Sequence, residues 1–458
     1  MAHPLRRSLQ ALSLSLLLVP LAHAQVPPGY YANVDTTSSA SLRSTLHALI
    51  KDHTRFPYTA STTDTWDILA QACQDPNNSA NILDVYHNQS LLKQTGGNNF
   101  YDREHTWPNS YGFPNDGGTN YPYTDCHMLF LCDPVYNSAR ENKPYRSCSS
   151  SCNEYVTVAN NGQGGGSGSY PGNSNWTSGT STSGTWETWS GRRGDVARAL
   201  LYFDVRYEGG NHGITGAPEP DLILTDNVTL IANSATGNNE SVAYMGLLTD
   251  ILAWNRQDPP DTWERHKNDV VQGYQGNRSP FIDHPEWVDC IFTGACSTGT
   301  PFCFGDGTTA TACPCGNTGA SGHGCANSAV AAGAKLKAMG RTSPDGVVLT
   351  ASQMLPTSFC IFLQGTTNVS SGAVFGDGVR CAGGALLRLA SKSAVLGSAQ
   401  FPDANDLSIT ARSAALGGPI PSGAVRIYQT YYRDPSASFC PAPSGSTFNI
   451  TNAVSLQW

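Results

Sequence analysis

The stretch from Phe100 to Tyr145 constrains this chain most, because it concentrates side chains that bind ions and transfer protons. In chain order these side chains are Glu104, His105, Asp125, His127, Asn137, Arg140 and Asn142. Hydrolysis of a phosphodiester needs an activated water, a cation for the negative charge and help for the leaving oxygen. A carboxylate, imidazoles, amides and an arginine in one short stretch therefore predict metal-assisted phosphodiester chemistry.

Adjacent residues in this stretch favour different roles. On an extended segment, neighbouring side chains point to opposite faces. Glu104 and His105 therefore cannot both bind one ion unless the backbone turns sharply between them. A neutral histidine near its unperturbed pKa is a suitable general base at pH 7. The pair is best explained as one ion ligand and one base.

The order of the motifs resembles the endonuclease I family of secreted bacterial nucleases, which are built on a ββα-metal (His-Me) finger. The motifs are E-H-x-x-P, then D-x-H, then N-x-x-R-x-N, beginning at Glu104 and ending at Asn142. The later run WERHKNDVVQGYQGNRSPFIDHPEWV, from Trp263 to Val288, resembles the end of domains of this family. The likeness spans Ser41 to Val288, which is over half of the chain.

The resemblance assigns the chemistry residue by residue. It implies that His105 is the general base and that Glu104 and Asn137 bind one divalent ion. Two oxygen ligands, with water and phosphate completing the shell, suit Mg²⁺, with Ca²⁺ and Mn²⁺ as alternatives. Arg140 either contacts the scissile phosphate or braces the finger through a carboxylate, and the sequence leaves both roles open.

Further residues are expected around this centre. Asn142 and Arg278 are predicted to contact the nucleic-acid strand. The residues predicted to support the finger are Asp125, His127, Gln275 and Asn277. The sequence also departs from the family, since Thr106 stands where the motif has an apolar residue. No Arg or Lys lies between Tyr111 and Thr124, where some relatives carry a phosphate-binding arginine.

Two other functions are alternatives. One is a secreted binding or adhesion protein with an inactive finger, and the intact Glu104, His105 and Asn137 speak against it. The other is a metallopeptidase or a different hydrolase, but the chain contains no H-E-x-x-H or G-x-S-x-G. For a nuclease, the sequence leaves the choice between DNA and RNA open, because a site for phosphate and metal has no evident filter for the 2′-hydroxyl.

The first 24 residues read as a secretory signal peptide. Arg6 and Arg7 precede an apolar run, and Ala22-His23-Ala24 is a typical cleavage site. The run is too short to span a bilayer, and no later stretch is long enough. We therefore expect a secreted protein without a membrane span that begins at Gln25.

Cysteine and charge distributions divide the chain in two. Seven of the 14 cysteines lie at or before Cys296 and seven lie after it. Export favours disulfides, with Cys148–Cys152 and Cys290–Cys296 as local pairs. Cys313, Cys315, His323 and Cys325 could suggest zinc, but disulfides are the better explanation. Residues 25–296 carry a net charge of −13 and residues 297–458 a net charge of +3, so nucleic-acid contacts should be local.

Periodicity predicts an α+β nuclease domain over residues 25–296. Helices are expected at 41–53, 64–71, 194–208 and 242–254, and a strand at 80–88. A capping box of Asp261 and Glu264 should open another helix that runs through Val271. The segment 160–184, rich in Gly and Ser, is expected to be an exposed insertion.

After Ser297 short apolar runs alternate with turn residues, which predicts an all-β domain over residues 297–458, specifically a sandwich. The runs are at 347–349, 359–363, 385–389 and 425–432. The string FGDG occurs at 304–307 and again at 375–378. It resembles a C-terminal module of secreted proteins from planctomycete-type bacteria, and the sequence does not identify a partner for it.

Overall fold

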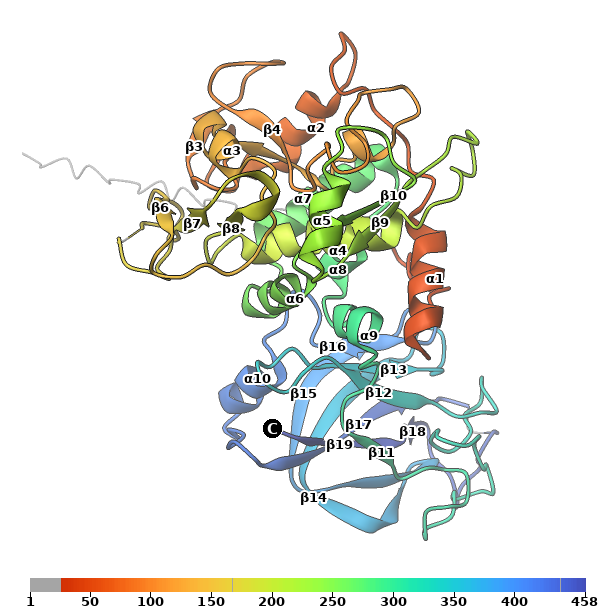
Figure 1. Cartoon of the computed structure of the whole chain (residues 1–458). Coiled ribbons are helices and arrows are strands. Elements are labelled where there is room, and N and C mark those ends of the chain that lie inside the picture. Colours follow the sequence, from red (N-terminus) through yellow and green to blue (C-terminus); the bar gives the residue numbers. More distant parts are fainter. Residues whose placement is uncertain (1–25, 167, 437) are drawn as a thin grey trace, which may run out of the picture.

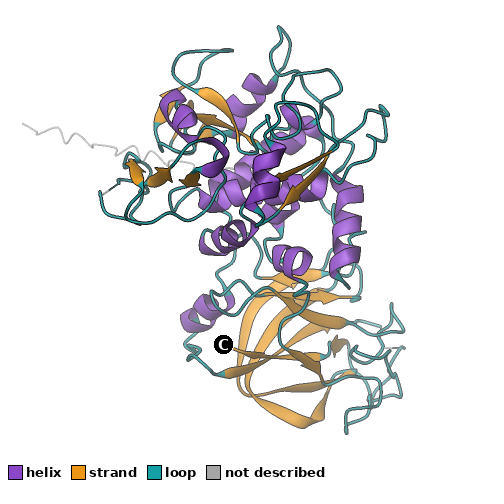
Figure 2. Cartoon of the chain, viewed as in Figure 1, coloured by secondary structure: helices purple, strands orange, loops and turns teal. Residues whose placement is uncertain are grey.

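The computed structural model describes residues 26–166, 168–436 and 438–458. The predicted signal peptide lies outside these residues. Helices gather in the part before residue 297, and long strands gather in the part after it (Figure 2). The first part is the N-terminal region and the second is the C-terminal region.

The N-terminal region is mainly helical. Its α-helices are α1 (Ser39–Ile50), α2 (Thr65–Ala72), α3 (Pro134–Arg140), α4 (Arg193–Arg206), α5 (Val228–Ser234), α6 (Leu248–Gln257), α7 (Thr262–Gln275), α8 (Pro280–Asp283) and α9 (Trp287–Thr293). Short 3₁₀ turns occur at η1 (Pro122–Thr124) and η2 (Ser181–Ser183). The helices predicted at 41–53, 64–71 and 194–208 are confirmed to within a few residues.

Its strands form small separate sheets. They are β1 (Gln74–Asp75), β2 (Asn78–Leu83), β3 (Ser90–Leu92), β4 (Asp102–His105), β5 (Leu129–Cys132), β6 (Asn153–Tyr155), β7 (Asn175–Ser178), β8 (Thr185–Glu187), β9 (Asp221–Leu224) and β10 (Val242–Met245). The sheets are β1-β2-β3, β4-β5, β6-β7-β8 and the parallel pair β9-β10.

Helix α4 forms the centre of the N-terminal region. Every residue from Gly194 to Arg206 is buried, and α1, α6, α8 and β9 pack around it. Its arginines have partners, as buried charges require. Arg198 binds both carboxylate oxygens of Glu264, and Arg206 binds Glu219 at 2.8 and 2.9 Å.

The predicted capping box at α7 is only half formed. The Asp261 side chain accepts a hydrogen bond from the Glu264 backbone N–H at 2.8 Å. The Glu264 carboxylate instead binds Arg198, because a buried guanidinium needs a carboxylate more than an exposed helix end does. A complete capping box forms at α2, between Asp64 and Asp67.

Three other sequence expectations are corrected. The single helix predicted at 242–254 is strand β10 followed by α6. The change from strand to helix occurs at Gly246, where an added Cβ would lie 2.1 Å from the Thr225 carbonyl oxygen. The strand predicted at 80–88 ends at Leu83, because the Asp84 carboxylate accepts hydrogen bonds from the next backbone N–H groups and forms a turn.

The third correction concerns the segment 160–184. It contains β7, which is the central strand of its sheet and has buried Asn175 and Trp176. Trp186 and Trp189 are also buried, so these tryptophans pack the segment onto the domain. The expectation that the segment has no packed structure is therefore wrong for its second half, which contains β7.

The C-terminal region is built from two sheets and one short helix, α10 (Ile409–Ala415). The larger sheet has the order β11-β19-β17-β14-β15, and β18 also pairs with β17. The smaller sheet has the order β12-β13-β16. The strands are β11 (Thr300–Phe302), β12 (Lys335–Met339), β13 (Val348–Ser352), β14 (Phe359–Phe375), β15 (Gly378–Ser393), β16 (Ala399–Phe401), β17 (Val425–Arg433), β18 (Phe448–Ile450) and β19 (Ala453–Gln457).

All four predicted apolar runs of this region lie in or at strands. Side chains from both sheets, including Leu349, Phe362, Phe401 and Tyr428, share one buried core. The second FGDG string forms the turn between β14 and β15, whose long ribbons run through the lower half of Figure 1.

Five disulfides each lie within a single region. They are Cys148–Cys152, Cys290–Cys296, Cys303–Cys381, Cys313–Cys325 and Cys315–Cys440. Both predicted local pairs are confirmed, and disulfides replace the zinc alternative. The remaining cysteines, all buried thiols, are Cys73, Cys126, Cys132 and Cys360. Within the described residues, no helix has both the length and the apolarity to cross a bilayer.

The two regions meet at α9 and the start of the smaller sheet (Figure 1). Arg341 donates to Asp289 at 2.8 Å, and Arg256 of the N-terminal region binds the same carboxylate. The Lys337 ammonium of the C-terminal region donates to the Thr36 carbonyl oxygen of the N-terminal region. Met339 packs against the N-terminal core. The junction thus combines one shared ion-pair cluster, a hydrogen bond and a small apolar contact.

We expect a chain that ends at Ser297 to fold without the C-terminal region. The Arg341 side chain is 45% exposed, and exposed ion pairs contribute about 0–1 kcal/mol. The midpoint of thermal unfolding should therefore lie within about 5 °C of that of the full chain. Circular dichroism under non-reducing conditions measures this. An unfolded truncated chain would show that the N-terminal region depends on its neighbour.

Candidate functional site

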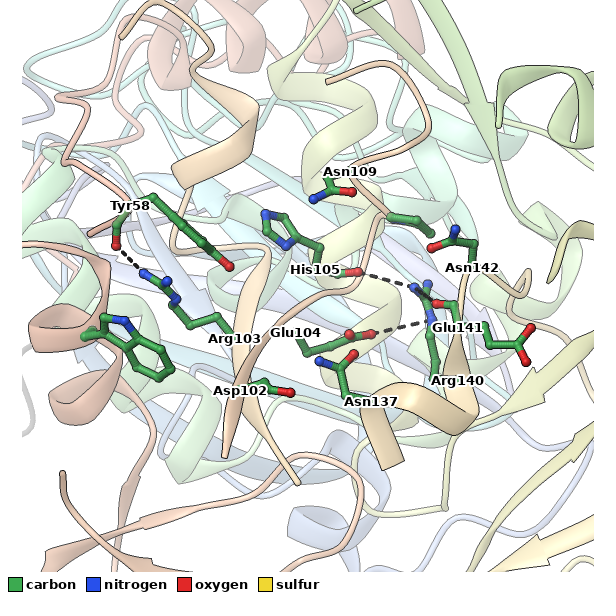
Figure 3. Close-up of a pocket in the computed structure, with 12 residues that line it drawn as sticks. Tyr58, Asp102, Arg103, Glu104, His105, Asn109, Asn137, Arg140, Glu141 and Asn142 are labelled. Atoms are coloured by element: carbon green, nitrogen blue, oxygen red, sulfur yellow. Dashed lines mark hydrogen bonds and ion pairs between the residues drawn. The ribbon is translucent and has the colours of Figure 1, made fainter. Parts of the chain in front are cut away.

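A pocket of about 360 Å³ lies where β4 and α3 meet (Figure 3). Strand β4 and helix α3 lie at the end of the molecule farther from the C-terminal region (Figure 1). The residues that line the pocket are Tyr58, Trp66, Asp102, Arg103, Glu104, His105, Pro108, Asn109, Asn137, Arg140, Glu141 and Asn142. All five residues predicted at the reaction centre or beside it between Glu104 and Asn142 are among them.

Local structure explains why these residues converge. Strand β4 pairs antiparallel with β5, so that Glu104 lies opposite Phe130 and His105 opposite Leu129. Helix α3 follows β5 directly. Its first turn begins at Pro134, and the Asp133 side chain caps it by accepting from the Val135 N–H at 2.7 Å. The chain therefore forms two strands and a helix in succession, with the pocket between the first strand and the helix.

Glu104 is a buried carboxylate with one oxygen held and one oxygen free. Its Oε1 accepts a hydrogen bond from the Tyr86 hydroxyl at 2.9 Å and lies 3.5 Å from both the Tyr145 hydroxyl and Arg140 Nε. Burial raises the pKa of Glu104, and the Arg140 charge opposes this shift. Within the described residues, Oε2 has no hydrogen-bond partner, so it is available to a ligand.

Asn137 lies on α3 beside the Glu104 carboxylate (Figure 3). Its backbone belongs to the helix, accepting from the Glu141 N–H at 3.1 Å. Its side-chain amide makes no hydrogen bond to any described residue, although it lines the pocket. An oxygen of Glu104 and the amide oxygen of Asn137 thus both remain available on one side of the pocket.

His105 lies on the other side of β4 from Glu104, as alternation along the strand predicts (Figure 3). Its Nε2 lies 2.9 Å from the Tyr123 carbonyl oxygen. Because a carbonyl oxygen only accepts, Nε2 carries the proton and Nδ1 keeps its lone pair. Burial lowers the pKa of His105 to about 4, so the ring is neutral at pH 7. Nδ1 has no hydrogen-bond partner among the described residues.

Arg140 makes the contacts of a brace. Its Nη2 donates to the Thr106 carbonyl oxygen at 2.6 Å, and its Nη1 donates to the Glu141 carbonyl oxygen at 3.0 Å. The guanidinium also lies 4.6 Å from the Tyr145 ring centroid, and only 1% of the residue is exposed. Of the two roles that the sequence leaves open, these contacts match bracing through the Glu104 carboxylate.

The four predicted supporting residues form a buried network. Asp125 accepts from the Gln275 amide at 3.0 Å and from Tyr202 at 3.0 Å. His127 Nε2 lies 3.1 Å from the Asn277 carbonyl oxygen. This network joins the segment before β5 to the end of α7, which fixes the position of the strand that pairs with β4.

Of the two residues predicted to contact the nucleic-acid strand, only one lines the pocket. Asn142 lines the pocket, and its carbonyl oxygen accepts from the Tyr111 hydroxyl at 2.6 Å. Arg278 does not line the pocket. Its guanidinium binds Asp283 at 2.7 and 2.8 Å and Asp269 at 2.7 Å, because these carboxylates of α8 and α7 lie next to it. The expectation that Arg278 contacts substrate is therefore not supported by its position.

Sequence reasoning missed an aromatic and cationic part of the pocket. Arg103 lies with its guanidinium 3.3 Å from the Tyr58 ring centroid and 4.1 Å from the Trp66 ring centroid. It forms no ion pair with any described carboxylate, unlike Arg140. The available signal was its place two residues before His105, which puts both on one face of the strand.

Comparison with known proteins agrees with this geometry. The family model described as Endonuclease I matches residues 38–286. The chain belongs to the endonuclease I family. An extracellular ribonuclease of Bacillus amyloliquefaciens is 36% identical over 281 residues, covering 61% of this chain and 82% of the relative. One from Bacillus subtilis (strain 168) is 37% identical over 284 residues, covering 61% and 84%.

The family match ends at residue 286, before the C-terminal region begins. The likeness of that region to a module of planctomycete-type bacteria therefore stays a prediction.

The supporting network, together with His53, whose Nδ1 lies 3.9 Å from Asp125 Oδ2, predicts acid sensitivity. Burial lowers the pKa of His53 to about 3 and that of His127 to about 4. Below about pH 6.5 each histidine takes up a proton when the protein unfolds. As the pH decreases, the free energy of unfolding should therefore fall by up to about 1.4 kcal/mol per pH unit for each histidine. Asp125, with a pKa of about 2, loses its contribution only at lower pH. Urea titrations between about pH 7 and pH 5 measure the slope.

The control is His53→Gln, because the amide oxygen can still accept from Arg206 Nε, which lies 3.1 Å from His53 Nδ1. This variant should lose about one proton from the pH slope. An unchanged slope, or a flat profile in the parent protein, would contradict the role given to these histidines.

Proposed function

We propose that this protein is a secreted, divalent-metal-dependent, sequence-nonspecific endonuclease that hydrolyses phosphodiester bonds of DNA and RNA. The observation that carries the proposal is one pocket with a neutral histidine, whose Nδ1 is free, beside a carboxylate oxygen and an amide that are also free. Membership of the endonuclease I family and the two extracellular relatives support it. The intact set of Glu104, His105 and Asn137 argues against an inactive binding protein.

The order of elements supports a ββα-metal finger made of β4, β5 and α3. The two strands pair antiparallel and the helix follows at once. Helix α3 contacts β4, which brings Asn137 to Glu104. The finger thus gives the ligands of one ion from a strand and a helix, and the base from the same strand.

One divalent ion fits the donors that remain. The described residues hold no group of three or more His, Cys, Asp and Glu placed to bind a metal. Glu104 Oε2 and the Asn137 amide oxygen would therefore be the protein ligands, with water and substrate phosphate completing the shell. This donor set suits Mg²⁺, which keeps several waters and prefers oxygen, and Mn²⁺ and Ca²⁺ are alternatives. When bound, the ion supplies charge stabilisation at the phosphate and at the leaving oxygen.

His105 carries the proton transfer. Its Nδ1 removes a proton from a water as the water oxygen bonds to phosphorus, the bond to the leaving sugar oxygen breaks, and that oxygen takes up a proton from solvent. The Tyr123 carbonyl oxygen holds the imidazole in the required tautomer and stabilises the imidazolium that forms. The Arg140 charge favours the ionised form of Glu104 and its guanidinium holds the carbonyl groups of His105 and Thr106, so the base and the ligand keep their separation.

A phosphate of the substrate also needs a cation from the protein. Arg103 is suited to this, because it lines the pocket and lacks a carboxylate partner among the described residues. It replaces the arginine that the motif of some relatives carries between residues 111 and 124. The names of both relatives favour RNA as a substrate, and a pocket for phosphate and metal accepts DNA as well.

We further propose that residues 25–296 form the nuclease domain and residues 297–458 a separate β-sandwich. The shared core of the two C-terminal sheets and the absence of any disulfide between the regions, among all 14 cysteines, support this division. The proposed reaction centre lies wholly in the first domain.

Chelation tests the proposed activity. Plasmid DNA and a long RNA should both be cut by the purified mature protein in Mg²⁺, and excess EDTA should abolish cutting because the ion supplies charge stabilisation. Adding back Mg²⁺, Mn²⁺ or Ca²⁺ should restore it. Undiminished cutting in EDTA, or no cutting with any of the three ions, would sink the proposal.

Variants separate the roles within the pocket. His105→Ala should lower kcat by at least about 100-fold while metal binding persists. Glu104→Ala and Asn137→Ala should weaken metal binding as well, because each removes a ligand. Arg103→Gln should raise KM without loss of the ion. Calorimetric metal titration and steady-state kinetics measure both properties. If His105→Ala loses the ion as fully as Glu104→Ala, the division of roles is wrong.

A further inference from the structure

A second groove, of about 550 Å³, lies on the C-terminal region. Phe359, Ile361 and Leu363 occupy alternate positions of β14 and therefore share one face of the sheet. The intervening Cys360 and Phe362 point the other way, into the core between the sheets. The groove is thus on the outer face of the larger sheet.

The groove is lined by arginines that lack partners. Arg388 of β15 and Arg433 of β17 are both exposed and both line it. Neither side chain forms an ion pair or hydrogen bond with any described residue. Lys392 on the same strand as Arg388 behaves differently, since it binds the carboxylates of Asp403 and Asp406. No carboxylate lines the groove, so its two positive charges are available to an anion.

Aromatic rings accompany these charges. Phe359 is 46% exposed, and Phe375 and Tyr431 line the same groove with ring centroids 6.2 Å apart. The Arg380 guanidinium lies 5.2 Å from the Phe375 ring centroid, which adds a third cation at this ring. Flat apolar faces beside arginines are the combination that holds unpaired bases and their phosphates.

We propose that this groove binds single-stranded nucleic acid, with bases on the aromatic rings and phosphates on Arg388 and Arg433. The choice of a polynucleotide rests on the proposed nuclease function, and charge supports it independently. The C-terminal region has a net charge of +3, whereas residues 25–296 carry −13 and repel a polyanion.

A single strand fits this groove better than a duplex does. A duplex hides its base faces in the stack and presents phosphates and groove edges. It would leave Phe359 and its apolar neighbours without contact. A single strand exposes both base faces and phosphates, so it can contact both the aromatic rings and the arginines that line the groove. The groove therefore holds the substrate polymer away from the reaction centre, and it favours long unpaired segments.

Binding is tested on the full mature chain carrying His105→Ala, in EDTA, so that no substrate is cut. The probe is a fluorescein-labelled oligouridylate of about 12 nucleotides, followed by anisotropy. Arg388→Gln combined with Arg433→Gln should raise Kd at least about tenfold and reduce the slope of log K against log salt by about 1.4. Phe359→Ala should raise Kd about tenfold through lost stacking.

The matched control combines Lys335→Gln with Arg426→Gln, which removes the same charge from strands β12 and β17 outside the groove. This control should bind within about twofold of the parent protein. Heparin is the competing anion without bases. If the groove variants bind oligouridylate like the parent, the proposal is wrong. It is equally overturned if the arginine variant loses heparin and oligouridylate alike while Phe359→Ala loses neither.

Kinetics of the otherwise wild-type chain give a second readout. The groove variants should raise KM for long RNA and leave the cleavage of substrates of about four nucleotides unchanged. The binding assay needs no turnover, so an inactive protein that still binds oligouridylate through the groove refutes only the nuclease function. An active enzyme with neutral groove variants refutes only the groove.

Discussion

The buried contact between Arg140 and Glu104 is the interaction on which the pocket depends. A buried carboxylate without a partner would take up a proton and lose its value as an ion ligand. The Arg140 charge opposes this uptake, and the same guanidinium donates to the carbonyl oxygens of Thr106, just after β4, and of Glu141, just after α3. The charge that favours the ionised form of Glu104 thus also holds the segment where the strand carrying His105 ends. The Arg140 guanidinium therefore acts both on the backbone position beside His105 and on the ionisation of Glu104.

The same principle organises the interior around α4. Arg198 and Arg206 are fully buried, and each is matched by a carboxylate from a different element. Glu264 comes from α7 and Glu219 from the loop before β9. Such pairs add little net stability, but removal of one partner leaves a costly buried charge. They therefore fix which elements surround α4, and α7 in turn carries Gln275 to the network behind β5.

The sequence predicts the site better than it predicts the frame. Glu104, His105 and Asn137 line one pocket as their motif predicts, because their spacing is short and persists through one strand pair and a helix. Arg278 lies outside the pocket, because the fold places its guanidinium beside Asp269 and Asp283. The motif alone does not report these partners. The Glu264 carboxylate binds Arg198, 66 positions away in the sequence, and does not complete the capping box. No local sequence pattern reports this contact. Segment 242–254 was predicted as one helix because its apolar residues fit a helical period, whereas pairing with β9 decides its first half.

The buried thiols have a consequence for how the chain matures. Cys73, Cys126 and Cys132 lie in the N-terminal core, and burial raises the pKa of each. In the folded protein they are protected from oxidation, because the thiolate is the reactive form. In the unfolded chain they compete with Cys148, Cys152, Cys290 and Cys296 for the same oxidant. Burial of Cys73, Cys126 and Cys132 in the core therefore favours the two observed disulfides of this region over pairings with these thiols.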